Sequence, residues 1–335
     1  MKRLCACALA VWLGLCGGLG AARAADAPPS LGICIYNGED TFIASFLAVM
    51  RGEAAGRAEV TVADAQNNQN RQNDQVEALL EGGVDALIVN AVDRTSAIYL
   101  MQMAARYGVP IVFFNREPLW EDLDAYEMAY YVGIDPKEQG LLQGKLAADY
   151  FKEHPSADKN GDGRMQLVVL KGEPGHQDAE LRTLYAIKSI QGEGIVLDKL
   201  REETALWERS LGQERMAALL NAYGDRIECI ISNNDDMALG AIDALKAAGY
   251  FADGRYIPVI GIDATAPAVE ALSQGSLYAT VVNNAYEQGK AVVLLTLLLT
   301  EGSRVHADNF PYELQGKVVY IQSEGMVADR AGTQP

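Results

Sequence analysis

The chain has 335 residues and a formal net charge of −17, with 49% apolar and 22% charged residues. This length is enough for about two domains, each with a core of its own. A chain this acidic repels nucleic acid and anionic membrane surfaces, so neither is an expected partner.

The first 24 residues differ from the rest of the chain. Lys2 and Arg3 give a positive start, residues 4–19 form an apolar run, and residues 22–24 read Ala-Arg-Ala, a small-residue cleavage site. This pattern predicts a secretory signal peptide at residues 1–24, too short and wrongly flanked for a membrane anchor. Cleavage removes three cations and no carboxylate, which changes the net charge from −17 to −20.

The cysteines do not suggest a disulfide framework. Three of the five leave with the signal peptide, while Cys34 and Cys229 lie in apolar, strand-like runs far apart in the sequence. We expect these two to be small core hydrophobes. Cys16 raises the alternative of a lipid anchor, but the bulky Leu15 before it argues against that processing. The predicted product is an exported, soluble protein.

From residue 31 onward, short apolar runs alternate with helical patterns. In the first half we predict strands at 31–36, 60–63, 85–90 and 110–115 and helices at 41–56, 72–82 and 96–107. In the second half we predict helices at 138–154, 178–192, 210–223, 236–248, 266–274 and 287–299 and strands at 166–171, 195–200, 229–232, 257–261, 278–282 and 318–321. This succession predicts an α/β fold with two doubly wound, Rossmann-like domains built on parallel sheets.

Residues 158–166 have the spacing of a calcium loop. Side-chain oxygens fall at the first, third, fifth and ninth positions, and Gly163 occupies the sixth, where the loop turns sharply. The full motif requires a bidentate Glu at the twelfth position, which here is Val169 in a predicted strand. If calcium binds, a carboxylate from a distant part of the chain must complete the shell. The alternative is a surface turn rich in Asp, Asn and Gly.

Short polar side chains recur where the predicted strands end. They are Asp40, Asn115, the run 233–235, Asp263 and the pair 283–284. In doubly wound sheets, ligands bind in the crevice beyond the carboxyl ends of the strands. Any one of these residues could instead cap a helix. Together, and without a cationic or Gly-rich phosphate loop, they predict a neutral, polyhydroxylated ligand.

Two aromatic residues fit the same ligand. A sugar needs planar donors and acceptors for its hydroxyls and flat apolar surface for its C–H faces. Phe42 follows Asp40 by two residues, and Trp207 lies in a polar stretch where a core Trp is less expected. Packing is the alternative for either residue alone, but beside the polar set they suggest a stacking pair.

The chain resembles the bacterial periplasmic D-galactose/D-glucose-binding proteins over essentially all of the mature sequence. The most specific segments are Gln72-Asn73-Asp74-Gln75, Val112-Phe113-Phe114-Asn115-Arg116-Glu117-Pro118, Tyr130-Tyr131-Val132-Gly133, Leu170-Lys171-Gly172-Glu173-Pro174-Gly175-His176 and Ser232-Asn233-Asn234-Asp235. The chain departs from the family pattern at Pro136, at Gln177 and in the C-terminal tail from Val327. None of these departures falls on a position that the resemblance assigns to the sugar.

The resemblance implies a site for each ligand. The implied sugar contacts are Asp40, Phe42 and Asn115 from the first domain, His176, Asp178, Arg182, Trp207, Asn234 and Asp263 from the second, and Asn283 at a crossover between them. Phe42 and Trp207 would sandwich the pyranose ring. The implied calcium ligands are Asp158, Asn160, Asp162, the Arg164 carbonyl, Gln166 and, supplying the missing carboxylate, Glu228.

The resemblance also implies a mechanism and partners. It implies a type I periplasmic-binding-protein fold, with residues 26–133 and 284–319 in one domain and 134–282 and 320–335 in the other. Three chain crossings, near 133–135, 282–284 and 320–322, would form a hinge that closes on D-galactose or D-glucose. The closed, monomeric form would deliver sugar in the periplasm to an ABC transporter of the inner membrane. A chemotaxis receptor is a second candidate partner, although no patch in the sequence points to it.

Three other interpretations are less consistent with the sequence. His176 with Asp178, or Asp40 with Asp263, could suggest an exported glycosidase, but no nucleophile signature or nucleophile elbow accompanies them. A sugar-responsive repressor would need a DNA-binding segment where this chain has a signal peptide. Ribose or another monosaccharide is the nearest alternative ligand. We therefore expect a binding protein and not an enzyme. The sequence does not distinguish glucose from galactose as the preferred ligand.

Overall fold

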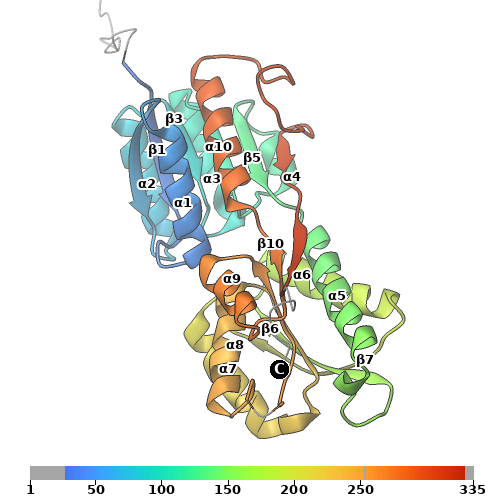
Figure 1. Ribbon diagram of the computed structural model, residues 1–335. Coiled ribbons are helices and arrows are strands. Elements are labelled where there is room, and N and C mark those ends of the chain that lie inside the picture. The colour runs from blue at the N-terminus through green and yellow to red at the C-terminus, as the bar shows by residue number, and fades with distance from the viewer. Residues whose placement is uncertain (1–26, 253, 329–335) are drawn as a thin grey trace, which may run out of the picture.

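The structure is a computed structural model that describes residues 27–252 and 254–328. The predicted signal peptide and residues 329–335 of the predicted second domain lie outside this range. The described chain forms two six-stranded sheets, each covered by helices on both faces (Figure 1). Within the described ranges, no helix has the length and apolar character needed to cross a membrane.

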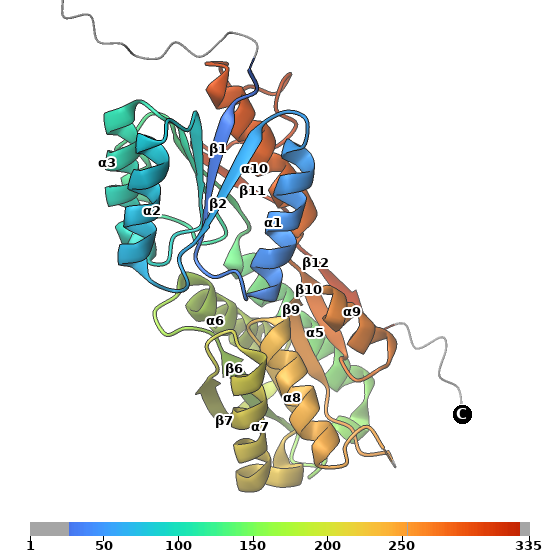
Figure 2. The same cartoon turned by 90° about the vertical axis from the view of Figure 1, so that its left-hand side faces the viewer.

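The first sheet and its helices form what we term the first lobe. Its strands run in the order β11-β5-β4-β3-β1-β2, and all neighbours are parallel. Their bounds are β1 Ser30–Ile35, β2 Glu59–Asp64, β3 Ala86–Val89, β4 Ile111–Phe114, β5 Ala129–Gly133 and β11 Val318–Tyr320. Helices α1 (Thr41–Ala54) and α10 (Ala285–Thr300) cover one face, and α2 (Gln69–Glu81) and α3 (Ala97–Tyr107) cover the other (Figure 2). The short α4 (Trp120–Leu123) and the 3-10 turn Arg94–Ser96 complete this lobe.

The second lobe has the same plan. Its strands run β12-β10-β9-β8-β6-β7, with bounds β6 Arg164–Lys171, β7 Val196–Thr204, β8 Cys229–Ser232, β9 Val259–Asp263, β10 Ala279–Val282 and β12 Glu324–Val327. Helices α5 (Pro136–Glu153) and α6 (Gln177–Gly192) cover one face. Helices α7 (Arg209–Tyr223), α8 (Asp235–Ala247) and α9 (Ala266–Ser273) cover the other. The predicted α/β fold with two doubly wound sheets is confirmed.

The cores form because the inner strands are apolar on both faces, as strands of covered parallel sheets are. In β1, Ile33 and Ile35 face α1 and α10, whereas Cys34 between them faces α2 and α3. Cys34 and Cys229 are both buried and unpaired, and burial raises the pKa of each thiol to about 12. Their prediction as core hydrophobes is confirmed.

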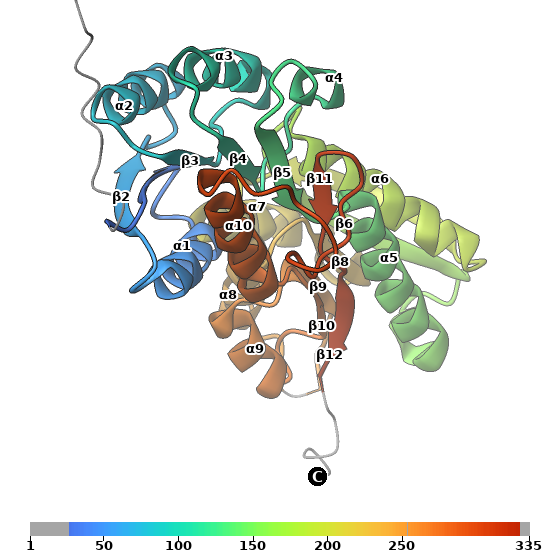
Figure 3. The same cartoon turned by 90° about the horizontal axis from the view of Figure 1, so that it is seen from above.

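The site is positioned by the way in which the two sheets meet. Each sheet has the strand order 2-1-3-4-5-6 when its strands are counted along the chain, so each has a switch point beside its first strand. The chain passes between the lobes three times, after β5, β10 and β11. The first and third crossings are joined, because Ile321 N–H donates to the Gly133 carbonyl at 2.8 Å. Seen from above, the strands of the first lobe form a middle layer (Figure 3). Helices α1 and α10 lie on one side of this layer, and α2 and α3 lie on the other.

Two strands were not predicted. β5 is short and follows an acidic loop, and its pairing with β4 and β11 defines it as a strand. β12 is an exposed edge strand without an apolar run, and it pairs antiparallel to β10 in a sheet expected to be wholly parallel. Edge strands of this kind are specified by their neighbour more than by their own pattern.

A close helix contact in the second lobe gives a testable prediction. A Cβ on Gly144 of α5 would lie 2.2 Å from the Ala186 carbonyl oxygen and 2.6 Å from the Ser189 Cβ, both on α6. We expect Gly144→Ala to lower the free energy of unfolding by about 1–3 kcal/mol, because overpacking outweighs the better helix propensity of Ala. Urea unfolding would measure this change.

The matched control is Gly52→Ala in α1. Gly52 is exposed within a helix, and a Cβ added there would have no atom of another element within 4 Å. This variant should gain about 0.5–1 kcal/mol of stability from helix propensity. A Gly144→Ala protein as stable as the Gly52→Ala protein would show that the contact between α5 and α6 is not as close as described.

Candidate functional site

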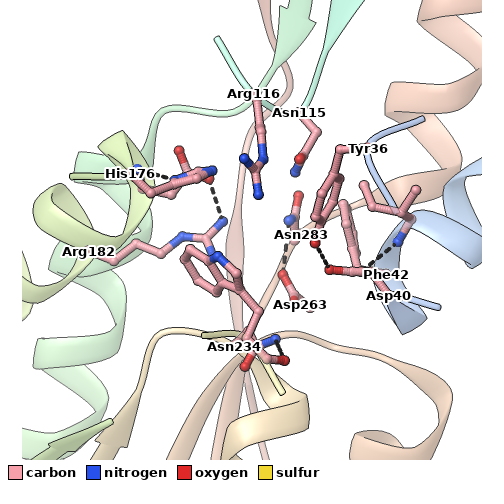
Figure 4. A pocket seen from close by; sticks show the side chains of 13 residues that line it. Tyr36, Asp40, Phe42, Asn115, Arg116, His176, Arg182, Asn234, Asp263 and Asn283 are labelled. Atoms are coloured by element: carbon pink, nitrogen blue, oxygen red, sulfur yellow. Dashed lines mark hydrogen bonds and ion pairs between the residues drawn. The ribbon is translucent and has the colours of Figure 1, made fainter. Parts of the chain in front are cut away.

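A cavity lies between the carboxyl edges of the two sheets. All ten residues that the sequence assigned to a sugar line it: Asp40, Phe42, Asn115, His176, Asp178, Arg182, Trp207, Asn234, Asp263 and Asn283. They come from opposite sides, with Asp40 and Phe42 facing His176 and Arg182 across the cavity (Figure 4).

Asp40 is held at the start of α1 by two hydrogen bonds. Its Oδ1 accepts from the Ile43 N–H at 2.9 Å and caps the helix, and its Oδ2 accepts from the Tyr36 hydroxyl. Phe42, on the first turn of the same helix, is 7% exposed and meets Phe46 edge-on at 5.9 Å between ring centroids. The helix cap therefore fixes both a carboxylate and an aromatic ring in the cavity wall.

Asn115 and Arg116 follow β4 and enter the cavity beside Tyr36 (Figure 4). Asn115 has a left-handed backbone (φ 59°), which Asn tolerates better than most residues. Its amide Oδ1 accepts from Asn90 Nδ2 at 3.1 Å. The Arg116 guanidinium lies 4.1 Å from the Tyr36 ring centroid and forms an ion pair with Glu173 of the second lobe at 3.1 Å.

His176 is a neutral donor in this site. It caps α6, and its Nδ1 accepts from the Asp178 N–H at 3.1 Å, which leaves the proton on Nε2. Burial lowers the pKa of His176 well below its usual value, and the cations Arg116 and Arg182 lower it further. The Nε2–H is therefore available to donate to a ligand.

Arg182 is buried, and each of its three guanidinium nitrogens has a partner. Its Nε donates to Gln139 at 2.8 Å, and one terminal nitrogen donates to the Asn233 carbonyl at 2.8 Å. The other terminal nitrogen pairs with Asp178 at 3.1 Å. Burial raises the pKa of Asp178, and the neighbouring Arg182 opposes that rise. The guanidinium is thus fixed in plane, which suits it to sugar hydroxyls.

Trp207 lines the cavity, and its own backbone is left-handed (φ 70°). Its ring lies against Gly172, where an added Cβ would come within 2.3 Å of the indole, so only Gly leaves room for it. The ring meets His176 edge-on at 5.1 Å between centroids. Asn234, the cap of α8, donates from Nδ2 to the Trp207 carbonyl at 3.0 Å and fixes the loop.

Asp263 and Asn283 close the floor of the cavity. Asn283 donates to Asp263 at 3.0 Å and accepts from Gln288 at 2.7 Å. Burial raises the pKa of Asp263 well above its usual range, with a further rise from Asp235 behind it. Asp235 itself is buried, and burial raises its pKa to about 7. Two buried carboxyl groups therefore lie on this side of the cavity, and only Asp263 lines it.

The predicted calcium loop is ordered by its own carboxylate. Asp158 accepts from the backbone N–H groups of Gly161, Asp162 and Gly163 at 2.8–3.1 Å. Asn160 Oδ1 accepts from the Asp162 N–H at 2.9 Å, and Asp162 Oδ1 accepts from the Arg164 N–H at 2.8 Å. These hydrogen bonds hold the backbone of the loop in a tight turn.

Glu228 lies beside this loop, at the start of β8. Its two oxygens accept from the backbone N–H groups of Gln166 and Lys159, at 3.0 and 2.7 Å, and it is 1% exposed. The Oε1 atom of Gln166 is buried without a hydrogen-bond partner. Over the described residues, no group of three or more His, Cys, Asp or Glu side chains converges to hold a metal. A metal here would depend on amide and carbonyl oxygens as well as carboxylates, as calcium sites do.

Three lining residues were not predicted: Tyr36, Ile43 and Arg116. Tyr36 directly follows β1 and Arg116 directly follows Asn115, so both lie at strand ends. The pattern of short amides and carboxylates at strand ends does not include Tyr or Arg. A pattern that includes every polar residue at a strand end contains both.

Comparison with known proteins agrees with this geometry. Residues 31–304 match the model of the periplasmic binding protein domain. The chain is 41% identical over 318 residues to the D-galactose/methyl-galactoside binding periplasmic protein MglB of Haemophilus influenzae, covering 94% of each chain. It is 33% identical over 271 residues to a putative rhizopine-binding protein of Rhizobium meliloti, covering 80% of this chain and 82% of that one.

A solved structure agrees as well. The solute-binding protein of an ABC transporter from Bacillus halodurans, with bound myo-inositol, superposes with a TM-score of 0.77 at 31% identity, covering 92% of this chain and 97% of that one. The predicted resemblance and the expectation of a binding protein are both confirmed. The chain belongs to the periplasmic binding protein family, whose members bind solutes and are not enzymes.

Proposed function

We propose that this protein binds D-galactose or D-glucose in the periplasm and delivers it to an ABC transporter. The observation that carries the proposal is the convergence of ten predicted residues, from both lobes, on one cavity. The relative named for galactose and methyl-galactoside binding supports the same ligand class.

The residue types suit a hexose. Asp40 and Asp263 supply acceptors, Arg182 and the His176 Nε2–H supply donors, and Asn115, Asn234 and Asn283 supply both. Carboxylate and guanidinium groups make the stronger, charge-assisted hydrogen bonds to hydroxyls. Phe42 and Trp207 supply flat apolar surface for the two faces of the ring.

The mechanism that we propose is hinge closure. Residues 26–133 and 284–319 would move against residues 134–282 and 320–335 about the three crossings. Sugar would bind one lobe of the open form, and the second lobe's contacts would form on closing, so that ligand shifts the population toward the closed form. The transporter would recognise that closed form, and the protein would act as a monomer. No patch among the described residues points to a chemotaxis receptor, so signalling is left out of the proposal.

We also propose a calcium ion at the loop of residues 158–166. Asp158, Asn160, Asp162, the Arg164 carbonyl, Gln166 and Glu228 would hold it. The buried, unpartnered Oε1 of Gln166 and the buried carboxylate of Glu228 fit a cation at this place. Burial raises the pKa of Glu228, and a cation would offset that cost. Its role would be to stabilise the second lobe.

The sugar proposal is tested by calorimetry with the variant Asp40→Asn. Asn caps helices as well as Asp does, so α1 should keep its cap at Ile43 while the pocket loses a charged acceptor. We expect galactose or glucose to bind the wild-type protein one to one, with ribose silent. Asp40→Asn should weaken that binding by about 10- to 100-fold, since a hydrogen bond to a charged group contributes about 1.5–3 kcal/mol.

The control is Asp74→Asn, which removes a carboxylate from the exposed face of α2. It should bind hexose as the wild-type protein does. Absence of hexose binding by the wild-type protein would overturn the sugar proposal. Turnover of an aryl galactoside that is lost in Asp40→Asn would favour a glycosidase instead.

The calcium proposal predicts a stability change on removal of the ion. A chelator should lower the melting temperature of the mature protein by roughly 5 °C, since a ligand at about 100 times its Kd stabilises by about 2.7 kcal/mol. Added calcium should restore it. Glu228→Gln should abolish this dependence, because the carboxylate is removed. Gln keeps only one of the two oxygens that accept from the backbone N–H groups of Gln166 and Lys159, so the melting temperature in chelator should also fall.

Calorimetric titration of the chelated protein with calcium would measure the same site directly. Magnesium at equal concentration is the control ion, because it prefers a smaller, octahedral site. Melting temperatures that are unaffected by chelator and by calcium would remove the calcium proposal and leave the sugar proposal standing.

A further inference from the structure

The two residues that follow Asn115 reach across to the second lobe without belonging to the predicted sugar set. Arg116 forms its ion pair with Glu173 at 3.1 Å. Glu117 accepts a hydrogen bond from Gln177, the first residue of α6, with 3.1 Å between Gln177 Nε2 and Glu117 Oε2. Each contact joins the loop after β4 in the first lobe to the segment between β6 and α6 in the second.

Glu117 is a buried carboxylate that no sugar contact explains. It is 2% exposed, and its Oε1 accepts from the Tyr320 hydroxyl at 3.0 Å and from the Trp120 indole N–H. Tyr320 ends β11 at the third crossing between the lobes. Glu117 therefore links the first lobe, a hinge strand and, through Gln177, the second lobe. Its Oε2 has Gln177 as its hydrogen-bond donor.

Gln177 provides the contact between Glu117 and the second lobe. It opens α6, so the Glu117 carboxylate approaches the N-terminal end of a 16-residue helix, where a negative charge is favoured. Burial raises the pKa of Glu117, and its hydrogen bonds to Tyr320 and Trp120 oppose the rise. A buried acceptor that loses its donor is costly, so the contact stabilises the arrangement in which the lobes meet.

We propose that Glu117 and Gln177, assisted by Arg116 and Glu173, form an interdomain clasp that sets how tightly this protein holds its sugar. The inference rests on the proposed function and deepens it, because it assigns affinity to residues that do not line the sugar cavity. Of the four, only Arg116 lines that cavity.

The clasp stabilises the closed form and not the open form. Its contacts exist only when the lobes are together, so they add to the stability of the closed, sugar-bound form. Sugar enters the open form, in which the clasp is broken. Weakening the clasp should therefore speed sugar release and leave the association rate unchanged.

The test is stopped-flow measurement of galactose or glucose association and release, using the fluorescence of the mature protein, for two variants of Gln177. Gln177→Ala removes the donor and should raise the release rate and Kd by about tenfold. Gln177→Glu places a second carboxylate against Glu117 and should raise both further. A Glu also favours the first turn of α6, so the sugar-free melting temperature should not fall in this variant.

Two other variants define the specificity of the effect. Gln191→Ala removes the same side chain from the exposed, far end of α6 and should bind as the wild-type protein does. Glu173→Gln removes the more exposed partner of Arg116, whose side chain is 47% exposed, and should raise the release rate by only about twofold.

The outcomes separate the clasp from the sugar assignment. If the wild-type protein binds hexose and both Gln177 variants release it at the wild-type rate, the clasp proposal is wrong. A lower association rate with unchanged release also overturns it. If the wild-type protein binds no hexose, the proposed function fails. The clasp is defined by the sugar affinity that it sets, so it then fails together with the proposed function.

Discussion

The cavity depends on the requirement that buried polar and charged groups find partners. Two parallel sheets meet at their carboxyl edges, which places carboxylates, amides and a guanidinium out of reach of bulk water. Arg182 is 3% exposed, yet Gln139, the Asn233 carbonyl and Asp178 accept its donors. Because each of these partners comes from a different element, the guanidinium has one position. A ligand that meets it finds its donors already oriented, so less ordering is needed on binding.

Residues at the starts of three helices also have two roles. Asp40, His176 and Asn234 each cap a helix with one side-chain atom and line the cavity with the rest of the side chain. A cap residue must occupy one position to reach the backbone N–H of the first turn. The helices therefore determine where these pocket residues lie. The sequence leaves open whether such a residue caps a helix or contacts a ligand, and here each of the three residues caps a helix and also lines the cavity.

This double use explains what the sequence could predict. Strand ends follow from apolar runs, and parallel strands put their ends at one edge, so Asp40, Asn115, Asn234, Asp263 and Asn283 could be assigned to one crevice from local pattern alone. His176, Asp178, Arg182 and Glu228 came instead from resemblance. Local pattern has no signal for them, since their place depends on loops that bring distant segments together.

What the sequence could not predict depends on contacts between separate elements. Tyr36 became a pocket residue because Asp40 and Arg116 lie against it, and β12 became a strand because β10 offers an edge. Gln177 was recognised only as a departure outside the sugar set. Its importance depends on Glu117, which lies 60 residues away and is buried by the meeting of the lobes.

The two kinds of contact across the cleft have different consequences for function. Contacts to the sugar select the ligand, because a hydroxyl in the wrong orientation leaves a buried partner unpaired. Contacts between the lobes stabilise closure for every ligand alike, so they change affinity without changing selectivity. Substitutions at Gln177 should therefore change affinity and leave the selectivity that Asp40 and Arg182 provide unchanged. A transport protein must release its sugar as well as capture it, and an interlobe contact adjusts release while leaving the pocket intact.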